Sequence, residues 1–197
     1  MFQRRHALIM LATGCVLPST ALGAPIRYQL DPDHSQVGFR FKLNGTTQSG
    51  SMPVERADIT VDPQNLSASR VDVTVTAARA RTGLIFITQA MTSPEVLDTA
   101  QFPTIRFVSR RIALGASGRI SNGARITGDL TLRGITRPIT LQAALYRQRG
   151  TAPDDLRQLD VVLSGGLNRN HFGASGFPNL VADTVALDIR ARITAVK

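Results

Sequence analysis

Residues suited to catalysis are scarce in this chain, which has one cysteine, three histidines and no tryptophan among 197 residues. Cys15 lies within the first 24 residues, so a Cys/His metal cluster cannot form in the rest of the chain. His34 and His171 remain there, and two histidines alone make a poor zinc site. The sequence contains neither a Gly-x-Ser-x-Gly elbow nor a glycine-rich phosphate loop. It therefore predicts a protein that is not an enzyme and needs no metal or cofactor.

The first 24 residues have the features of an export signal. Arg4 and Arg5 precede an apolar run over 7–22, which is shorter than the roughly 20 residues of a membrane-spanning helix. We expect cleavage after Gly23 or Ala24, which leaves 25–197 as a single mature domain. That domain has no cysteine and folds without a disulfide.

Two variants of this signal stay open. The pair Arg4-Arg5 weakly resembles a twin-arginine signal, while ordinary secretion is the default. The stretch 12–15 weakly resembles a lipoprotein box with Cys15 as the acylated residue, but few apolar residues precede it.

The positive charge does not by itself identify a partner. Removal of Arg4 and Arg5 reduces 23 basic residues to 21 against 14 acidic ones, which leaves a formal net charge of +7. The arginines are spread over every segment and aromatic residues make up only 5% of the chain, so we expect no nucleic-acid partner. A transient contact with an anionic membrane surface stays open, and length and charge do not decide between a monomer and a homodimer.

From His34 onward, apolar and polar residues alternate with the two-residue period of β-strands. In 128–141, Leu130 and Leu132 alternate with polar residues, 134–138 interrupts the pattern, and Ile139 resumes it, which predicts a hairpin. About eight strands follow from such stretches. They would close into a barrel or pack as a two-layer sandwich, and periodicity does not separate the two.

One segment has helical spacing instead. Leu84, Ile87 and Met91 recur at that spacing, and Ser93 then stands as an N-cap before Pro94 at the first helical position. We expect two short helices there, inserted into a single all-β domain.

The inward residues decide what the strands enclose, because an eight-stranded barrel is either filled by its own side chains or holds one small ligand. Each inward residue either lines a ligand cavity or belongs to an ordinary hydrophobic core. Arg169 and His171, with His34, are the candidates for a head group, since arginine forks onto phosphate and histidine can donate or accept. Arg169 as a turn cap and His34 as a backbone partner are the structural alternatives. The expected apolar wall is Phe39, Phe41, Phe107, Leu130, Leu132, Leu141, Leu145, Val161, Leu163, Leu187 and Ile189.

Five motifs follow one another along the chain: YQLDPDHSQVGFRFK at 28–42, Thr82-Gly83, FPTIRFVS at 102–109, ITGDLTLRGITRPITL at 126–141 and LNRNHFGAS at 167–175. In this order they resemble the YceI-like family of polyisoprenoid-binding periplasmic proteins. The resemblance implies an antiparallel, eight-stranded, lipocalin-like barrel in the periplasm, and so favours the barrel over the sandwich. It also implies non-enzymatic binding, transport or storage of an isoprenoid lipid, such as an isoprenoid quinone or a prenyl pyrophosphate. The alternative is a stress-related interaction module with a filled barrel.

The chain departs from this family at two places. Family members often carry a polar run in the helical segment, where 84–91 is largely apolar here, and a histidine soon after the opening strand, where Asn44 stands here. The apolar helix predicts a more hydrophobic entrance to the barrel and leaves the identity of the ligand head group undecided.

Overall fold

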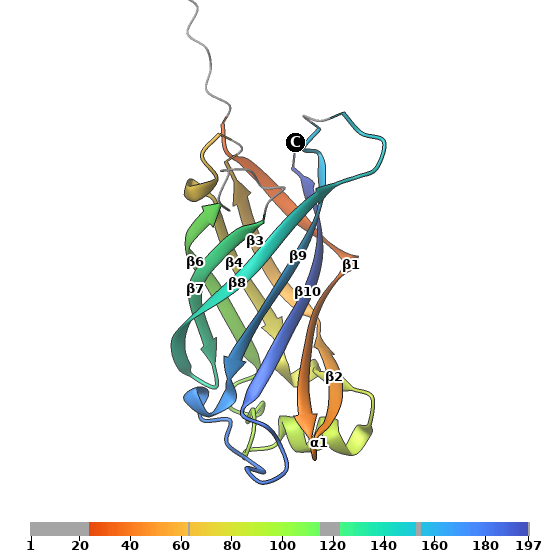
Figure 1. Ribbon diagram of the computed structural model, residues 1–197, viewed down its shortest axis with the longest axis vertical. Helices are drawn as coiled ribbons and strands as arrows, with labels where there is room; N and C mark the ends of the chain where they lie inside the picture. Colours follow the sequence, from red (N-terminus) through yellow and green to blue (C-terminus); the bar gives the residue numbers. More distant parts are fainter. Residues whose placement is uncertain (1–23, 63, 115–122, 153–154, 197) are drawn as a thin grey trace, which may run out of the picture.

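The chain forms one antiparallel sheet that closes on itself (Figure 1). The computed structural model describes residues 24–62, 64–114, 123–152 and 155–196, so the signal peptide predicted at 1–24 lies outside the described residues except for its last position. The strands are β1 (Ile26–Leu43), β2 (Thr46–Met52), β3 (Val54–Val61), β4 (Arg70–Thr76), β5 (Arg81–Thr82), β6 (Thr104–Leu114), β7 (Ala124–Leu132), β8 (Ile135–Arg147), β9 (Gln158–Asn168) and β10 (Thr184–Ala195).

The barrel has eight strand positions, because β2 and β3 share one position and β4 and β5 share the next. The long β1 pairs with β3 near its start and with β2 near its end, on either side of Pro53. Closure comes from β1 pairing with β10, so that Tyr28 lies opposite Ala195 and Phe39 opposite Leu187. The predicted eight-stranded antiparallel barrel is confirmed. Closure gives β1 and β10 a partner strand on both sides, which removes the two edges that an open sheet would have there.

Two hairpins turn on adjacent residues with left-handed backbone. Asn44 and Gly45 have φ of 53° and 78°, and Arg133 and Gly134 have 51° and 71°. This combination is typical of type I′ turns, whose twist matches that of the flanking strands. The predicted interruption at 134–138 was therefore too long, since β8 already begins at Ile135, opposite Leu132.

Only one of the two predicted helices forms. Helix α1 (Ile85–Thr92) is present, whereas 93–98 makes turns. Ser93 has extended backbone and is the C-cap of α1, and its hydroxyl donates to the Ala90 carbonyl at 2.8 Å. Its own carbonyl accepts from the backbone N–H of Asp98 at 2.8 Å, which closes a turn in place of a new helix.

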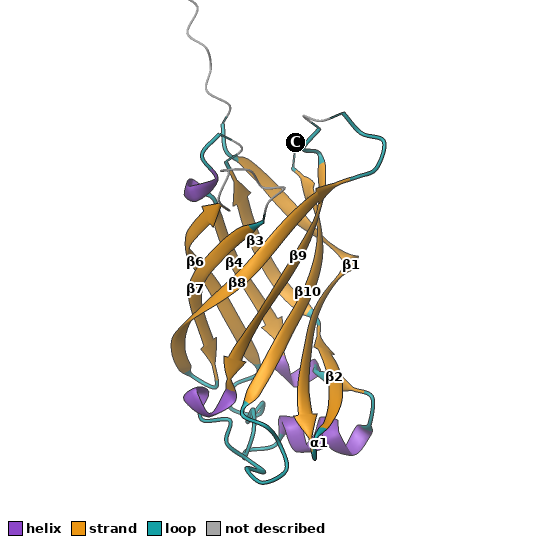
Figure 2. Ribbon diagram, viewed as in Figure 1, coloured by secondary structure: helices purple, strands orange, loops and turns teal. Residues whose placement is uncertain are grey.

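Short helical segments mark the two ends of the barrel (Figure 2). Helix α1 and the 3₁₀ segments η2 (Ala77–Arg79) and η4 (Arg169–Phe172) lie at one end, here called the α1 end, and η1 (Leu66–Ala68) lies at the other. No helix in the described part of the chain has the length and hydrophobicity needed to cross a bilayer.

The outer face of the barrel carries ion pairs between neighbouring strands. Arg106 binds both carboxylate oxygens of Asp72 at 2.9 and 2.6 Å, and Arg192 donates to Asp160 at 2.8 Å. These outward pairs agree with arginines scattered around the barrel, as the sequence indicated, and leave the inward face to apolar residues.

Candidate functional site

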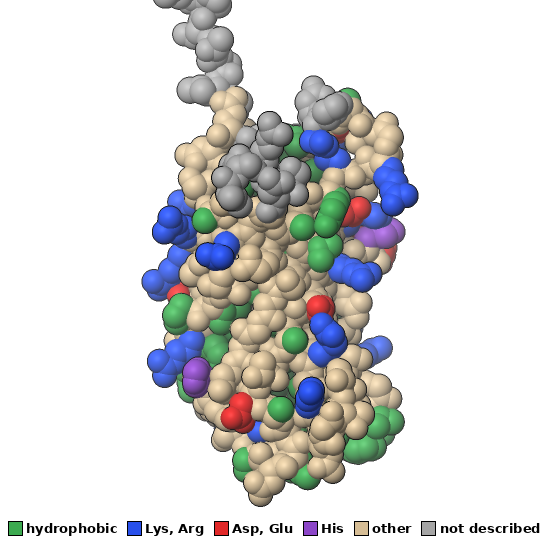
Figure 3. All heavy atoms as spheres, in the orientation of Figure 1, with side chains coloured by type: hydrophobic (Ala, Val, Ile, Leu, Met, Phe, Trp, Pro, Cys, Tyr) green, Lys and Arg blue, Asp and Glu red, His purple; other side chains and the backbone are tan. Residues whose placement is uncertain are grey.

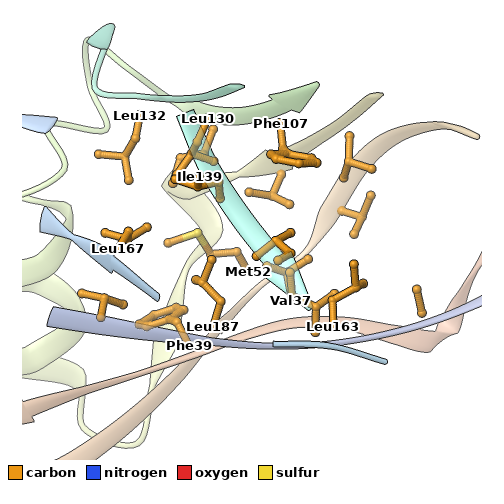
Figure 4. Close-up of a pocket in the computed structure, with 18 of the residues that line it drawn as sticks. Val37, Phe39, Met52, Phe107, Leu130, Leu132, Ile139, Leu163, Leu167 and Leu187 are labelled. Carbon is orange, nitrogen blue, oxygen red and sulfur yellow. The ribbon is translucent and has the colours of Figure 1, made fainter. Parts of the chain in front are cut away.

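The barrel encloses a cavity of about 520 Å³. Small-molecule sites in proteins usually fall between about 300 and 1,000 Å³, so the hollow is large enough for a ligand. Its wall is built from the inward residues of strands on all sides of the barrel and from α1, and Figure 4 shows several of these side chains facing one another across the hollow.

All eleven apolar residues predicted for the wall do line this cavity. Phe39, Leu130, Leu132 and Leu141 are buried in the adjoining core. The other seven are only half-buried although they point inward, because one side of each faces the hollow: Phe41, Phe107, Leu145, Val161, Leu163, Leu187 and Ile189. Their contact with a ligand stays a prediction.

Glycines on the inward face explain why the barrel stays hollow. The ring of Phe107 covers Gly128, where an added Cβ would lie 2.5 Å from its Cζ. In the same way, a Cβ at Gly165 would lie 2.7 Å from Cδ2 of Leu141, its partner on β8. Each large side chain thus leans over a glycine of a neighbouring strand. Because that space is free, the side chain reaches less far into the hollow.

Charge is nearly absent from the cavity wall. Within the described residues, the wall includes Arg169 and Arg190 but no aspartate, glutamate, lysine or histidine. Over the same residues, no group of three His, Cys, Asp or Glu side chains is placed to hold a metal ion.

Arg169 is buried, with 4% of its surface exposed, and its guanidinium is committed to the backbone. Nε donates to the Ala182 carbonyl at 3.2 Å and Nη2 to the Val181 carbonyl at 3.0 Å. Nη1 donates to the carbonyls of Ala174 and Gly176 at 2.6 and 2.7 Å. Four of its five N–H groups therefore hold the segment 174–182 against η4.

The three polar residues predicted for a head group do not converge. His34 lies at an irregularity of β1, where its Nδ1 lies 2.8 Å from Oδ2 of Asp31, and its side chain is 55% exposed. His171 is exposed on η4. Arg169 borders the cavity, whereas neither histidine is part of its wall.

Comparison with known proteins places this barrel in a family. The YceI-like domain matches residues 28–193. The chain belongs to the YceI-like family. A UPF0312 protein of Enterobacter sp. strain 638 is 30% identical over 147 residues, which cover 73% of this chain and 74% of that protein.

Two solved structures share the YceI-like fold. Burkholderia cenocepacia BcnA has a TM-score of 0.71 at 18% identity, covering 83% of this chain and 99% of that one. A polyisoprenoid binding domain from Saccharophagus degradans, described as implicated in plant cell wall breakdown, has a TM-score of 0.62 at 14% identity, covering 87% and 99%. The family resemblance found in the sequence is confirmed.

Part of this YceI-like cavity was not anticipated from the sequence. Val71, Val73 and Val75 line it, and their two-residue period could have added them to the predicted wall. Phe86 of α1 and Phe177 of the loop before β10 also line it. No periodic signal marks these two, because a helix and a loop place them at the α1 end of the barrel.

Proposed function

We propose that this YceI-like protein is a non-enzymatic carrier that holds a polyisoprenoid lipid in its barrel for transport or storage in the periplasm. An isoprenoid quinone or a prenyl pyrophosphate is the type of ligand we infer. The cavity carries this proposal, since a hollow of about 520 Å³ with an almost wholly apolar wall suits a hydrocarbon tail. The description of the Saccharophagus degradans neighbour as a polyisoprenoid binding domain supports the same ligand class.

The tail should dominate the affinity. Drug-sized ligands gain about 0.3 kcal/mol per non-hydrogen atom, so a five-carbon isoprene unit adds about 1.5 kcal/mol, roughly tenfold in affinity. The gain should stop at the length that fills the cavity. Arg169 supports this order of importance, because four carbonyls already occupy most of its donors.

The alternative of a stress-related module with a filled barrel has less support. A filled barrel requires that inward side chains meet across the centre. Phe107 and Leu141 instead lean over Gly128 and Gly165, and a hollow remains between the strands.

Organic extraction of the purified protein, followed by mass spectrometry, tests the proposal. Leu163→Trp places a large side chain in the hollow, because Leu163 lies on its wall and is only half-buried. Val162→Trp is the matched control, since Val162 is the neighbouring residue of β9 and is 40% exposed on the outer face.

We expect prenyl lipid with the native chain and with Val162→Trp, and a loss of at least tenfold with Leu163→Trp. Titration with prenyl alcohols of increasing length should show the tenfold steps. An extract without lipid, together with titrations that show no dependence on chain length, would refute the proposal.

A further inference from the structure

Large apolar side chains are exposed together at the α1 end of the barrel. Their exposed fractions are 76% for Ile85, 60% for Phe86, 47% for Leu84, 47% for Leu180 and 42% for Phe177. These five residues form what we call the apolar rim. Figure 3 shows hydrophobic side chains gathered at this end of the molecule, where α1 lies in Figure 1. Gathered apolar exposure of this kind marks an interaction surface.

The apolar rim is also free of ionisable side chains. The segments 82–94 and 172–182 contain no Asp, Glu, Lys, Arg or His, although charged residues make up 19% of the chain. The second segment meets the chain directly after the first one, since the backbone N–H of Gly176 donates to the carbonyl of Glu95 at 2.8 Å. An uncharged apolar surface can enter hydrocarbon without the cost of burying a charge.

The apolar rim continues into the cavity. Phe86, Phe177 and Leu180 belong both to the rim and to the cavity wall, whereas Leu84 and Ile85 lie outside that wall. A surface that covers the rim would therefore meet the hollow directly, and a lipid could pass between the two without exposing its tail to water.

We propose that the α1 end docks on a lipid bilayer, with Ile85 and Phe86 inserted among the acyl chains so that the cavity opens toward the membrane. This inference rests on the proposed function, because a prenyl lipid resides in membranes and needs an apolar path into the barrel. Helix α1 carries no charge and lies in the interface with its exposed apolar residues in the hydrocarbon.

The borders of the apolar rim carry both signs of charge. Lys42 is exposed next to the loop, where its carbonyl accepts from the N–H of Ala182 at 3.0 Å, and Arg81 precedes the helical segment. Glu95 and Asp183 follow the two uncharged segments. Arg133 also lies at this border, since its Nη1 donates to the Val96 carbonyl at 2.9 Å. With cations and anions both present at the border, docking depends on apolar insertion more than on anionic lipid, and salt has little effect on it.

Flotation with phosphatidylcholine vesicles, at low salt and again at high salt, tests the docking. Ile85→Asp is the test variant, because Ile85 is the most exposed residue of the apolar rim and lies outside the cavity wall. Val196→Asp is the matched control, since Val196 is 56% exposed directly after β10, which ends at the opposite end of the barrel (Figure 1), and the charge change is identical.

We expect the native chain and Val196→Asp to float with the vesicles at both salt concentrations, and Ile85→Asp to partition at least tenfold more weakly. Lipid extracted from each variant separates this inference from the proposed function. Prenyl lipid recovered from all three chains, with equal flotation of Ile85→Asp and native protein, would overturn the docking and leave the carrier intact. Loss of flotation with Ile85→Asp, together with extracts without lipid and prenyl alcohol titrations that show no dependence on chain length, would support the docking and refute the carrier.

Gel filtration completes the test. A native dimer that Ile85→Asp converts to a monomer, without vesicle binding by either, would show that a second copy covers the apolar rim and would overturn the proposal.

Discussion

Replacement of Arg169 with methionine should destabilise the fold far more than it alters ligand binding. The substitution keeps an apolar stem beside the cavity but removes the guanidinium that donates to the carbonyls of Ala174, Gly176, Val181 and Ala182. These bonds connect η4 to the loop that precedes β10 at the α1 end. Without them the loop loses its main attachment to η4.

The size of the loss in unfolding free energy depends on which of the four carbonyls water can reach after the substitution. Ala182 is exposed, so its carbonyl can be rehydrated, whereas Ala174 is buried. The bond to Ala174 is therefore the costliest, near the upper end of the about 1.5 to 3 kcal/mol expected for a bond to a charged donor, and the bonds to Gly176 and Val181, which are half-buried, add less. Removal of a buried charge that pairs with no carboxylate among the described residues returns part of this. We expect a net loss of about 3 kcal/mol.

Urea unfolding measures this loss. With an m-value of about 2 kcal/mol per molar, the midpoint for Arg169→Met should fall by about 1.5 M. Arg169→Lys keeps the charge but lacks the planar fork, so its midpoint should lie between those of the native chain and Arg169→Met. Arg110→Met is the control, because Arg110 is 70% exposed in a surface ion pair with Asp129, and it should show no measurable shift.

Two outcomes would contradict this reasoning. A midpoint for Arg169→Met equal to that of Arg110→Met would mean that the four hydrogen bonds do not stabilise the fold. An unchanged midpoint with a loss of prenyl lipid would instead assign Arg169 to the head group, as the sequence alone suggested.

Two further predictions concern the cavity and the far end of the barrel. Gly165→Ala should push the Leu141 side chain into the hollow, so titration should show a larger affinity loss for long prenyl alcohols than for short ones; an equal loss would contradict the shaping role of the glycine. Burial raises the pKa of Tyr28, whose hydroxyl donates to the Leu156 carbonyl at 2.8 Å. In Tyr146→Phe, which leaves Tyr28 as the sole tyrosine, phenolate absorbance should therefore have its midpoint above 10.0. Because the folded pKa is the higher one, this stabilisation is complete below about pH 10 and is lost as the pH rises through the folded value, and a midpoint at or below 10.0 would refute it.

The sequence by itself determined most of the strands and, within them, which side chains point inward, although β1 begins at Ile26 and not at His34, and no alternation marks β2 (Thr46–Met52). Alternation fixes the face of every residue in a strand, because successive side chains point to opposite sides of a sheet. All eleven predicted wall residues therefore reach the cavity. The prediction of a second helix after Ser93 was wrong. Serine suits the N-cap of a following helix and also the C-cap of a preceding one, and because α1 continues to Thr92, Ser93 is the C-cap of α1.

The residue pattern left closure open and the family resemblance implied it, but only the tertiary structure decided how the sheet closes and that it stays hollow. Closure depends on the pairing of β1 with β10, in which Phe39 lies opposite Leu187. The alternation of apolar and polar residues in a strand does not indicate which strand it pairs with. The hollow depends on large side chains lying over glycines of neighbouring strands, as Leu141 does over Gly165. The hydrogen-bond partners of Arg169 are likewise backbone carbonyls that only the folded chain brings within reach of its guanidinium. The physical reason is common to all three: local sequence sets the direction of a side chain, and packing between distant strands sets what it meets.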